Sequence, residues 1–432
     1  MRRDRLTRLA LCVLVLTGIG LVTSGESGGT PAATDLNRLR LVTLGSNFAV
    51  ASAPVTIRYD PAVAYNSVDD EFFVVWSDFR NSLAGDIYGQ RVTAEGSTTG
   101  PSIAVWVKEA SQSEPAIAYN RHDNQYLVVW GTQEPGFFNW VRGRRAGANG
   151  IPLLLTDFPI MSSGNEVAVV HNTANYDYFV TGRSFPTSRG INAQVVSHFG
   201  NLIGETDSIT SSNEIPGEAA YDSVNNRYLM IWWDQTSGSE RLDGRFFLPD
   251  GTGWGTVFTI SSDYPHAPQI AFDPVNHRFL VVFKSLTTPG LRGQLLTFDG
   301  NLIGSNFTIH AGSGNDNPDL VYSPSKRSFV VVWHNGSGDI FAKAITAEGR
   351  VADEPLFVAS GKAFPSPRIA YNSRRDEFLV VWEDDRNVTA GNAEIFAQVI
   401  SFLKRQTFVA DRVESSLVPA SARVGAEEDL RH

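Results

Sequence analysis

Two short clusters carry residue types that could do chemistry. Asp78-Phe79-Arg80 and Asp384-Asp385-Arg386 each follow an apolar run that ends in tryptophan. An arginine beside carboxylates can hold a ligand's carboxylate or the hydroxyl groups of a sugar, because its guanidinium presents a fork of donors. The simpler interpretation is a local salt bridge to the acidic residue that opens the next strand, which is ordinary on protein surfaces. We favour the salt bridge and keep Arg80 and Arg386 as candidate ligand-binding residues.

Aromatic side chains outside the repeated pattern form a second group of candidates. Phe137, Phe138 and Trp140 crowd one loop, and Tyr264 and Phe364 lie in two others. Exposed aromatic residues stack on sugars or hold a peptide, whereas buried ones pack over the end of a sheet. Packing is the more frequent role. These five residues therefore complete the predicted ligand-binding set as candidates on a loop face.

Patterns for catalysis and metal binding are missing from the sequence. The eight histidines lack the spacing of metal ligands. The carboxylates of Asp69-Asp70 and of Asp384-Asp385 are adjacent in sequence, and nothing marks either pair as an acid and a base. Gly25-Glu26-Ser27-Gly28-Gly29 matches the nucleophile-elbow string, but no strand precedes it and no helix follows it. We therefore predict no catalytic residue, no metal and no cofactor.

A repeated element must position the candidates. The run Phe72-Phe73-Val74-Val75-Trp76 recurs along the chain, most clearly at Tyr126–Trp130, Tyr228–Trp232 and Phe378–Trp382. The opening aromatic residues are separated by 54, 50, 52, 51, 50 and 49 residues, and a regular period of about 20–50 residues indicates a repeat architecture. These aromatic residues are Phe72, Tyr126, Tyr176, Tyr228, Phe279, Phe329 and Phe378.

Each repeat is predicted to hold four short strands. The first resembles Pro61–Asn66 and leads into a polar turn of constant length. The second is the aromatic run, which is apolar on both faces and must be covered on both sides; this favours blades packed around a ring over a two-layer sandwich. The third reads like Ile87-Tyr88-Gly89-Gln90, and its small residue leaves room for a neighbouring aromatic side chain. The fourth follows a glycine turn, as at Asn306–Ile309.

The last repeat has no clear fourth strand after its third. Gly45–Val50, at the other end of the chain, resembles Gly304–Ile309, so the N-terminal strand is predicted to complete the last repeat and close the ring. A rival is Thr407–Ala410, which resembles Leu356–Ala359 but lacks the preceding glycine turn. We rank it second.

The pattern resembles a seven-bladed β-propeller. The phrase Trp76–Arg80 followed by Asp86–Arg91 is similar to repeats of exported bacterial proteins of unassigned function. The resemblance implies an all-β fold with four antiparallel strands per blade and implies almost nothing about function. The repeated signatures of the Trp-Asp and kelch propellers are absent, as is the aspartate box of sialidases.

The N-terminus has the features of a secretory signal. Arginines precede the apolar run Leu9–Val22, which is short for a membrane span. An uncleaved N-terminal membrane anchor is the alternative. We predict a signal peptide over residues 1–24, a linker over 25–40, the propeller over 41–403 and a disordered tail over 404–432. Cys12, the single cysteine, would leave with the signal.

Function is predicted only as a class. The net charge of −10 argues against nucleic acid or an anionic membrane as the main partner. Loops between second and third strands, and between fourth and first strands, vary in length and share one side of the ring, which indicates a binding face. We expect a secreted, monomeric, non-enzymatic module that binds a protein or a glycan. The alternative is an extracellular glycan-active hydrolase or lyase, which would gather acidic, arginine or tyrosine side chains at the mouth of the central funnel.

Overall fold

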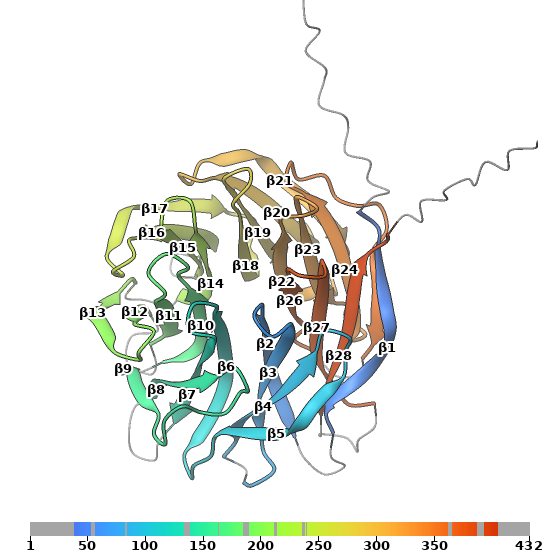
Figure 1. Ribbon diagram of the computed structural model, residues 1–432. Helices are drawn as coiled ribbons and strands as arrows, with labels where there is room; N and C mark the ends of the chain where they lie inside the picture. The colour runs from blue at the N-terminus through green and yellow to red at the C-terminus, as the bar shows by residue number, and fades with distance from the viewer. Residues whose placement is uncertain are drawn as a thin grey trace, which may run out of the picture. The chain divides into compact units, whose positions relative to one another are not determined.

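The computed structural model describes residues 39–52, 57–82, 84–133, 139–162, 164–184, 190–210, 214–235, 238, 240–361, 365–386 and 393–404. They all belong to one compact unit, Leu36–His432. Seven four-stranded antiparallel sheets form a ring in this unit, and no α-helix occurs among the described residues (Figure 1). The predicted seven-bladed propeller is confirmed.

The strands follow one another from the inside of each blade to its outside. Blades 1 and 2 are β2 (Arg58–Asn66), β3 (Glu71–Asp78), β4 (Asp86–Thr93), β5 (Thr98–Trp106), β6 (Ser111–Asn120), β7 (Gln125–Gln133), β8 (Trp140–Gly147) and β9 (Phe158–Ser162). Blades 3 and 4 are β10 (Asn165–His171), β11 (Tyr178–Arg183), β12 (Ile191–Val196), β13 (Leu202–Ser208), β14 (Glu214–Asp222), β15 (Arg227–Asp234), β16 (Arg241–Phe247) and β17 (Gly253–Ser261). Blades 5 and 6 are β18 (Pro265–Asp273), β19 (Arg278–Ser285), β20 (Gly290–Thr297), β21 (Leu302–Ala311), β22 (Asp316–Ser323), β23 (Ser328–His334), β24 (Asp339–Thr346) and β25 (Leu356–Ser360). Blade 7 is β26 (Arg368–Asn372), β27 (Glu377–Asp384), β28 (Glu394–Phe402) and the N-terminal β1 (Leu41–Ala51).

The N-terminal strand closes the ring, as predicted. Leu41 pairs with Phe402, and β1 runs antiparallel to β28 along the outer edge of blade 7 (Figure 1). The Phe48 ring of β1 lies 3.0 Å from where a Cβ on Gly96 would be, in the hairpin turn of blade 1. Phe158 and Gly200 make the same kind of contact between blades 2 and 3, so the closing junction resembles the others. The rival segment Thr407–Ala410 lies outside the described residues.

The second strand of each blade forms the core. The tryptophans of this strand are buried between neighbouring blades, and the apolar clusters combine side chains from adjacent sheets. The second strand is therefore apolar on both faces because a neighbouring blade covers each face, as predicted. The prediction for blade 3 was wrong by two residues. Its second strand begins at Tyr178, which pairs with His171, and the predicted Tyr176 ends the preceding turn. The buried tryptophans are Trp76, Trp130, Trp232, Trp333 and Trp382.

The structure explains why a small residue followed by glutamine recurs in the third strand. A Cβ on Gly89 would lie 2.5 Å from the Phe73 ring, so the small residue does make room for an aromatic side chain. The following Gln90 donates from its side-chain amide to the carbonyl oxygens of Thr99 and Gly100, at 2.9 and 3.1 Å. Gly100 has a φ of 69°, and the neighbouring strand bulges there. The glutamine therefore satisfies backbone acceptors that the bulge leaves unpaired.

The constant turn between first and second strands ties each blade to the next. Asn66, at the end of β2, donates to the side chain of Asn124 in blade 2, and Asn372 donates to Asp70 across the closing junction at 3.0 Å. Both asparagines are fully buried. The last turn residue has a left-handed backbone in every blade, with φ between 49° and 65°. A turn of any other length would misplace these side chains, which accounts for its constant length.

Candidate functional site

The inner strands of the blades surround a central channel. A cavity of about 440 Å³ lies at the N-terminal ends of these strands, and a deeper one of about 180 Å³ shares Glu218, Gln269 and Arg368 with it. Second strands end and third strands begin at this end of each blade. The cavity therefore opens on the face of the variable loops, which we call the channel mouth.

A bulge in the inner strands shapes the channel mouth. The pairing of β2 with β3 shifts between Tyr59 and Ala62, and that of β6 with β7 shifts between Ser113 and Ala116. The residues within these shifts, Asp60 and Glu114, have φ values of 56° and 54°. Left-handed backbone at residues other than glycine costs about 1–3 kcal/mol and persists where the surroundings impose it. These acidic side chains are thus held at the cavity wall.

Six carboxylates gather at the channel mouth, and backbone amides of neighbouring blades hold several of them. The Asp60 N–H donates to Glu383 Oε1 at 2.5 Å, and the Ile369 N–H donates to Asp319 Oδ2 at 2.8 Å. Carboxylates of one blade therefore accept hydrogen bonds from the backbone of the neighbouring blade. The six are Asp60, Glu114, Glu166, Glu218, Asp319 and Glu383.

Burial weakens the acidity of these groups. Desolvation raises the pKa of Glu114 to about 7, and the charges of Asp60 and Glu166 add to the rise. The channel wall surrounds Glu218, whose surface is still partly accessible, and this desolvation raises its pKa to about 7. The pKa of Glu383 rises to about 8, by desolvation first and then by repulsion from Asp60. Near neutral pH, Glu114, Glu218 and Glu383 therefore keep their protons for a substantial part of the time.

Arg368 is the cation among the residues that line the two cavities. Its charge lowers the pKa of Asp60, Glu218, Asp319 and Glu383, against the larger effect of burial. No hydrogen bond or ion pair joins its guanidinium to another residue that the structure describes. The side chain is thus free to bind a ligand, although one positive charge serves several carboxylates.

Glu114 and Glu166 come from neighbouring blades. The Glu166 N–H donates to Glu114 Oε2 at 2.6 Å, and Glu166 in turn accepts from Arg183 at 2.9 Å. Glu166 therefore has a cationic partner, whereas the partner of the Glu114 carboxyl among the described residues is the backbone amide.

Within the described ranges, no cluster of histidine, cysteine and acidic residues has the arrangement of a metal site, and no helix is long and apolar enough to cross a membrane.

The two candidate arginines form local salt bridges away from the channel. Arg80 pairs with Asp78, two residues earlier, at 2.6 Å and covers the Tyr88 ring at 3.9 Å. Arg386 pairs with Asp384 in the same way and donates to Asn47 of β1 at 3.0 Å. The local salt bridge was the favoured interpretation. Its partner in blade 1 is Asp78, however, and not Asp86 at the start of the next strand, because Asp78 is buried and already accepts from Trp76 and Arg58.

The aromatic candidates are spread over the loop face. Trp140 opens β8 and is half-buried, and Tyr264 is 37% exposed with its hydroxyl 3.4 Å from the Gly238 carbonyl oxygen. Neither residue lines the central cavities, and no contact joins them to each other. Phe137, Phe138 and Phe364 lie outside the described residues. The prediction of a ligand site at these side chains stays a prediction.

The acidic channel mouth was missed at the level of individual residues. A weak signal existed: Asp60-Pro61 and Glu114-Pro115 place an acid directly before the proline that opens the first strand. The sequence does not show that the strand bulges there and turns these side chains to the cavity. Acidic side chains and Arg368 do gather at the channel mouth, which is the arrangement that the alternative of a glycan-active enzyme would require.

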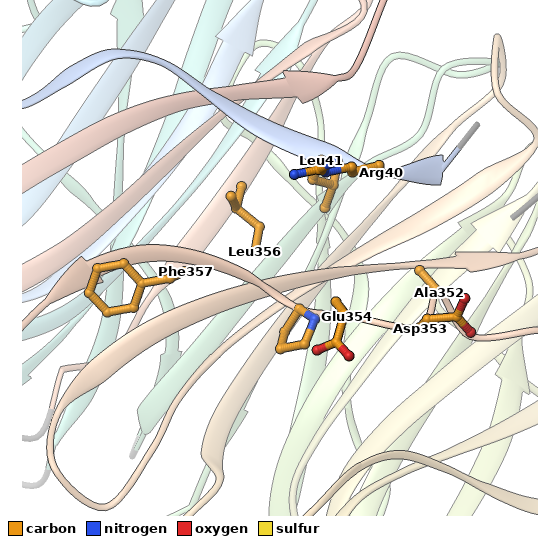
Figure 2. A pocket seen from close by; sticks show the side chains of 8 residues that line it. Arg40, Leu41, Ala352, Asp353, Glu354, Leu356 and Phe357 are labelled. Atoms are coloured by element: carbon orange, nitrogen blue, oxygen red, sulfur yellow. The ribbon is translucent and has the colours of Figure 1, made fainter. Parts of the chain in front are cut away.

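A cavity of about 530 Å³ at the outer rim is the weaker candidate. Arg40 and Leu41, at the start of β1, form one side, and the segment Ala352–Phe357, which leads into β25, forms the other (Figure 2). Its charged groups are Arg40, Asp353 and Glu354. The central channel brings together carboxylates from six blades, with perturbed pKa values, so we regard it as the candidate site.

Comparisons with known proteins identify the fold. No protein-family model and no curated protein matches the chain. Among solved structures, a protein of unknown function from Dyadobacter fermentans DSM 18053 is similar with a TM-score of 0.54 and 8% identity, over 84% of this chain and 99% of that one. The BP39L lectin from Burkholderia pseudomallei is similar with a TM-score of 0.58 and 12% identity, over 80% of this chain and 98% of that one. Identity this low shows a shared fold alone.

Proposed function

We propose that this chain is an exported binding module whose ligand enters the channel mouth on the variable-loop face. The observation that carries the proposal is the convergence of four carboxylates and the Arg368 guanidinium on a cavity of about 440 Å³, with Asp319 in the adjoining cavity and Glu383 bonded to the Asp60 N–H. Pockets that combine convergent polar groups with perturbed pKa values are the default binding sites of a fold. Export follows from the arginine-rich start and the short apolar run of residues 9–22.

The chemistry of the channel mouth favours a ligand rich in hydrogen-bond donors. Ionised carboxylates accept from hydroxyl and ammonium groups, and the carboxyls of Glu114 and Glu218, with pKa values of about 7, both accept and donate. A purely anionic ligand would be repelled, because Arg368 is outnumbered. A sugar meets these requirements. The similar fold of a lectin supports the view that a fold of this kind can carry a glycan-binding site.

A glycan array tests the proposal against a panel of immobilised mono- and oligosaccharides. Glu218→Gln should abolish binding to at least one group of the saccharides that the native chain retains. Blade 5 already carries Gln269 at the matching position, so the ring should accommodate the substitution. Glu205→Gln makes the same charge change on the exposed outer strand β13 and should bind like the native chain. If Glu218→Gln retains every saccharide that the native chain binds, no ligand of this array enters the channel mouth.

A second function is favoured by the unequal carboxyl groups. Glycoside hydrolases use an acid that keeps its proton near neutral pH beside a second carboxyl group, and Glu114, with a pKa of about 7, lies next to Asp60 and Glu166. The alternative is therefore a glycan-active hydrolase or lyase at the same site. Release of reducing ends from array-positive saccharides would support it, provided that Glu114→Gln stops the release and keeps the binding. If saccharides are retained and never cleaved, the enzyme alternative is rejected and binding remains as the proposed function.

A further inference from the structure

Four rings cluster on the face opposite the channel mouth, between blades 2 and 3. His122 lies in the turn after β6, Tyr176 in the turn after β10, and His198 and Phe199 in the turn after β12. His122 stacks on Tyr176 with ring centroids 3.8 Å apart and planes 18° apart, and the centroids of His198 and Phe199 are 3.9 Å apart. His198 also contacts both His122 and Tyr176, at 6.4 and 6.3 Å. We call these four residues the aromatic shelf.

The outer members of the aromatic shelf are open to solvent. Phe199 is 64% exposed, and the side chain of His122 is 50% exposed. Tyr176 and His198 are half-buried and support them. Two carboxylates border the rings: Asp123 Oδ1 lies 2.9 Å from His122 Nδ1, and Asp177 Oδ1 lies 3.9 Å from His198 Nδ1.

Tyr176 departs from the repeat to build the aromatic shelf. The matching turn residues of blades 2 and 4, Asn124 and Asn226, accept a hydrogen bond from the tyrosine hydroxyl of their own first strand, at 2.8 and 3.0 Å. Tyr176 occupies the same left-handed backbone, with a φ of 65°, although a bulky residue is disfavoured there. The tie to blade 2 goes instead through its carbonyl oxygen, which accepts from Asn120 at 3.2 Å. The ring is thereby released to stack on His122.

We propose that the aromatic shelf is a second carbohydrate site, separate from the channel mouth. The apolar C–H face of a pyranose ring would stack on the exposed rings of His122 and Phe199, as sugars do on aromatic side chains. Asp123 and Asp177 would accept hydrogen bonds from its hydroxyl groups. Tyr176 acts as a positioning residue that holds the His122 ring flat. Four side chains suit a ligand of one or two sugar rings, since a stable protein partner covers roughly 800 Å².

The test uses the full chain on the same array of mono- and oligosaccharides. Tyr176→Asn restores the residue found at positions 124 and 226 and suits the left-handed backbone, so the melting temperature should not fall. We expect it to lose at least tenfold in affinity for one group of retained saccharides, and His122→Ala should lose the same group. Glu218→Gln should leave that group unchanged, which separates the aromatic shelf from the channel mouth.

The histidine rings provide a direct readout. Addition of an array-positive methyl glycoside should shift the imidazole NMR signals of His122 and His198, and Tyr176→Asn should remove the shift while channel binding persists. Three results would overturn the proposal: no retained saccharide, equal retention by Tyr176→Asn and the native chain, or imidazole shifts caused by a proline-rich peptide and by no saccharide.

Discussion

The two ends of each inner strand have opposite electrostatic characters. At the turn end, Asn66, Asn120 and Asn372 are buried and bonded to the next blade, so the polar groups there have partners. At the channel mouth, Glu114 is desolvated beside Asp60 and Glu166, and desolvated Glu218 shares the charge of Arg368 with other carboxylates. Each inner strand thus connects a turn end whose polar groups are hydrogen-bonded to a channel mouth whose carboxyl groups are desolvated. We expect the hydrogen bonds of the turn end to offset the cost of the unbalanced charge at the channel mouth.

Removing the strand that completes blade 7 would break both ends at once. Deletion of residues 38–52 removes β1 and leaves the backbone of β28 unpaired along its length. Blade 7 carries Asn372 at the turn end and Glu383 at the channel mouth. We expect loss of cooperative unfolding and aggregation. Thermal melts check this, with deletion of residues 405–432 as the control that should melt within a few degrees of the native chain. A native-like melt for the first deletion would show that closure does not depend on β1.

Removing one hydrogen bond between blades at the turn end tests the contribution of that end by itself. Asn372 accepts from the Arg374 and Arg375 amides at 2.9 and 3.0 Å and donates to Asp70. Asn372→Ala should lower the free energy of unfolding by roughly 2–3 kcal/mol, because it leaves buried donors and acceptors unpaired. Denaturant titration measures the change. Asn225→Ala, at an exposed position of the blade 4 turn, is the control and should cost under about 1 kcal/mol. Equal costs would mean that the turn ring is not the scaffold.

A titration tests the channel mouth. The pKa of Glu383 is about 8 in the folded chain and lies near 4.5 without burial. The folded state therefore holds the proton more tightly, and this contribution to stability is complete below about pH 4.5 and is lost as the pH rises through 8. Glu383→Gln keeps the oxygen that accepts from Asp60 and removes the charge. At pH 9 it should stabilise the protein by on the order of 1–2 kcal/mol.

The control for this effect is the same comparison at pH 5, where native chain and variant should unfold at nearly equal denaturant concentrations. Glu205→Gln on β13 should show no such dependence on pH. A variant that gains nothing at pH 9 would show that the channel carboxylates are solvated well enough to ionise freely, and the contrast between the two ends would disappear.

The scaffold was predictable from sequence because packing repeats. Trp76 and its counterparts recur at a fixed period, and Gly45–Val50 repeats the glycine turn of Gly304–Ile309, so the blades and the closing strand could be assigned. The binding end was less predictable. Asp60 and Glu114 reach the channel through a left-handed bulge, and no residue type announces a bulge when the residue is not glycine.

The same limit explains the errors of detail. Tyr176 and Tyr178 are equally aromatic, and only the pairing of Tyr178 with His171 decides which one opens the strand. Gln90 recurs beside a small residue, but its bonds reach carbonyl oxygens nine and ten residues away in a bulged neighbour. Interactions that depend on backbone conformation are invisible to patterns of residue type.

The pairing of Leu41 with Phe402 has a practical consequence. Both ends of the folded ring leave together at the turn end of blade 7, where the Leu403 N–H also donates to the Arg40 carbonyl oxygen at 2.7 Å. A fluorescent protein, an affinity tag or a solid support joined directly at Arg40 or Leu403 is therefore attached on the side away from the channel mouth. Chains immobilised through either of these two residues on a sensor chip present that mouth to the flowing solution. The same arrangement allows several copies to be displayed side by side on a particle with every channel facing outward.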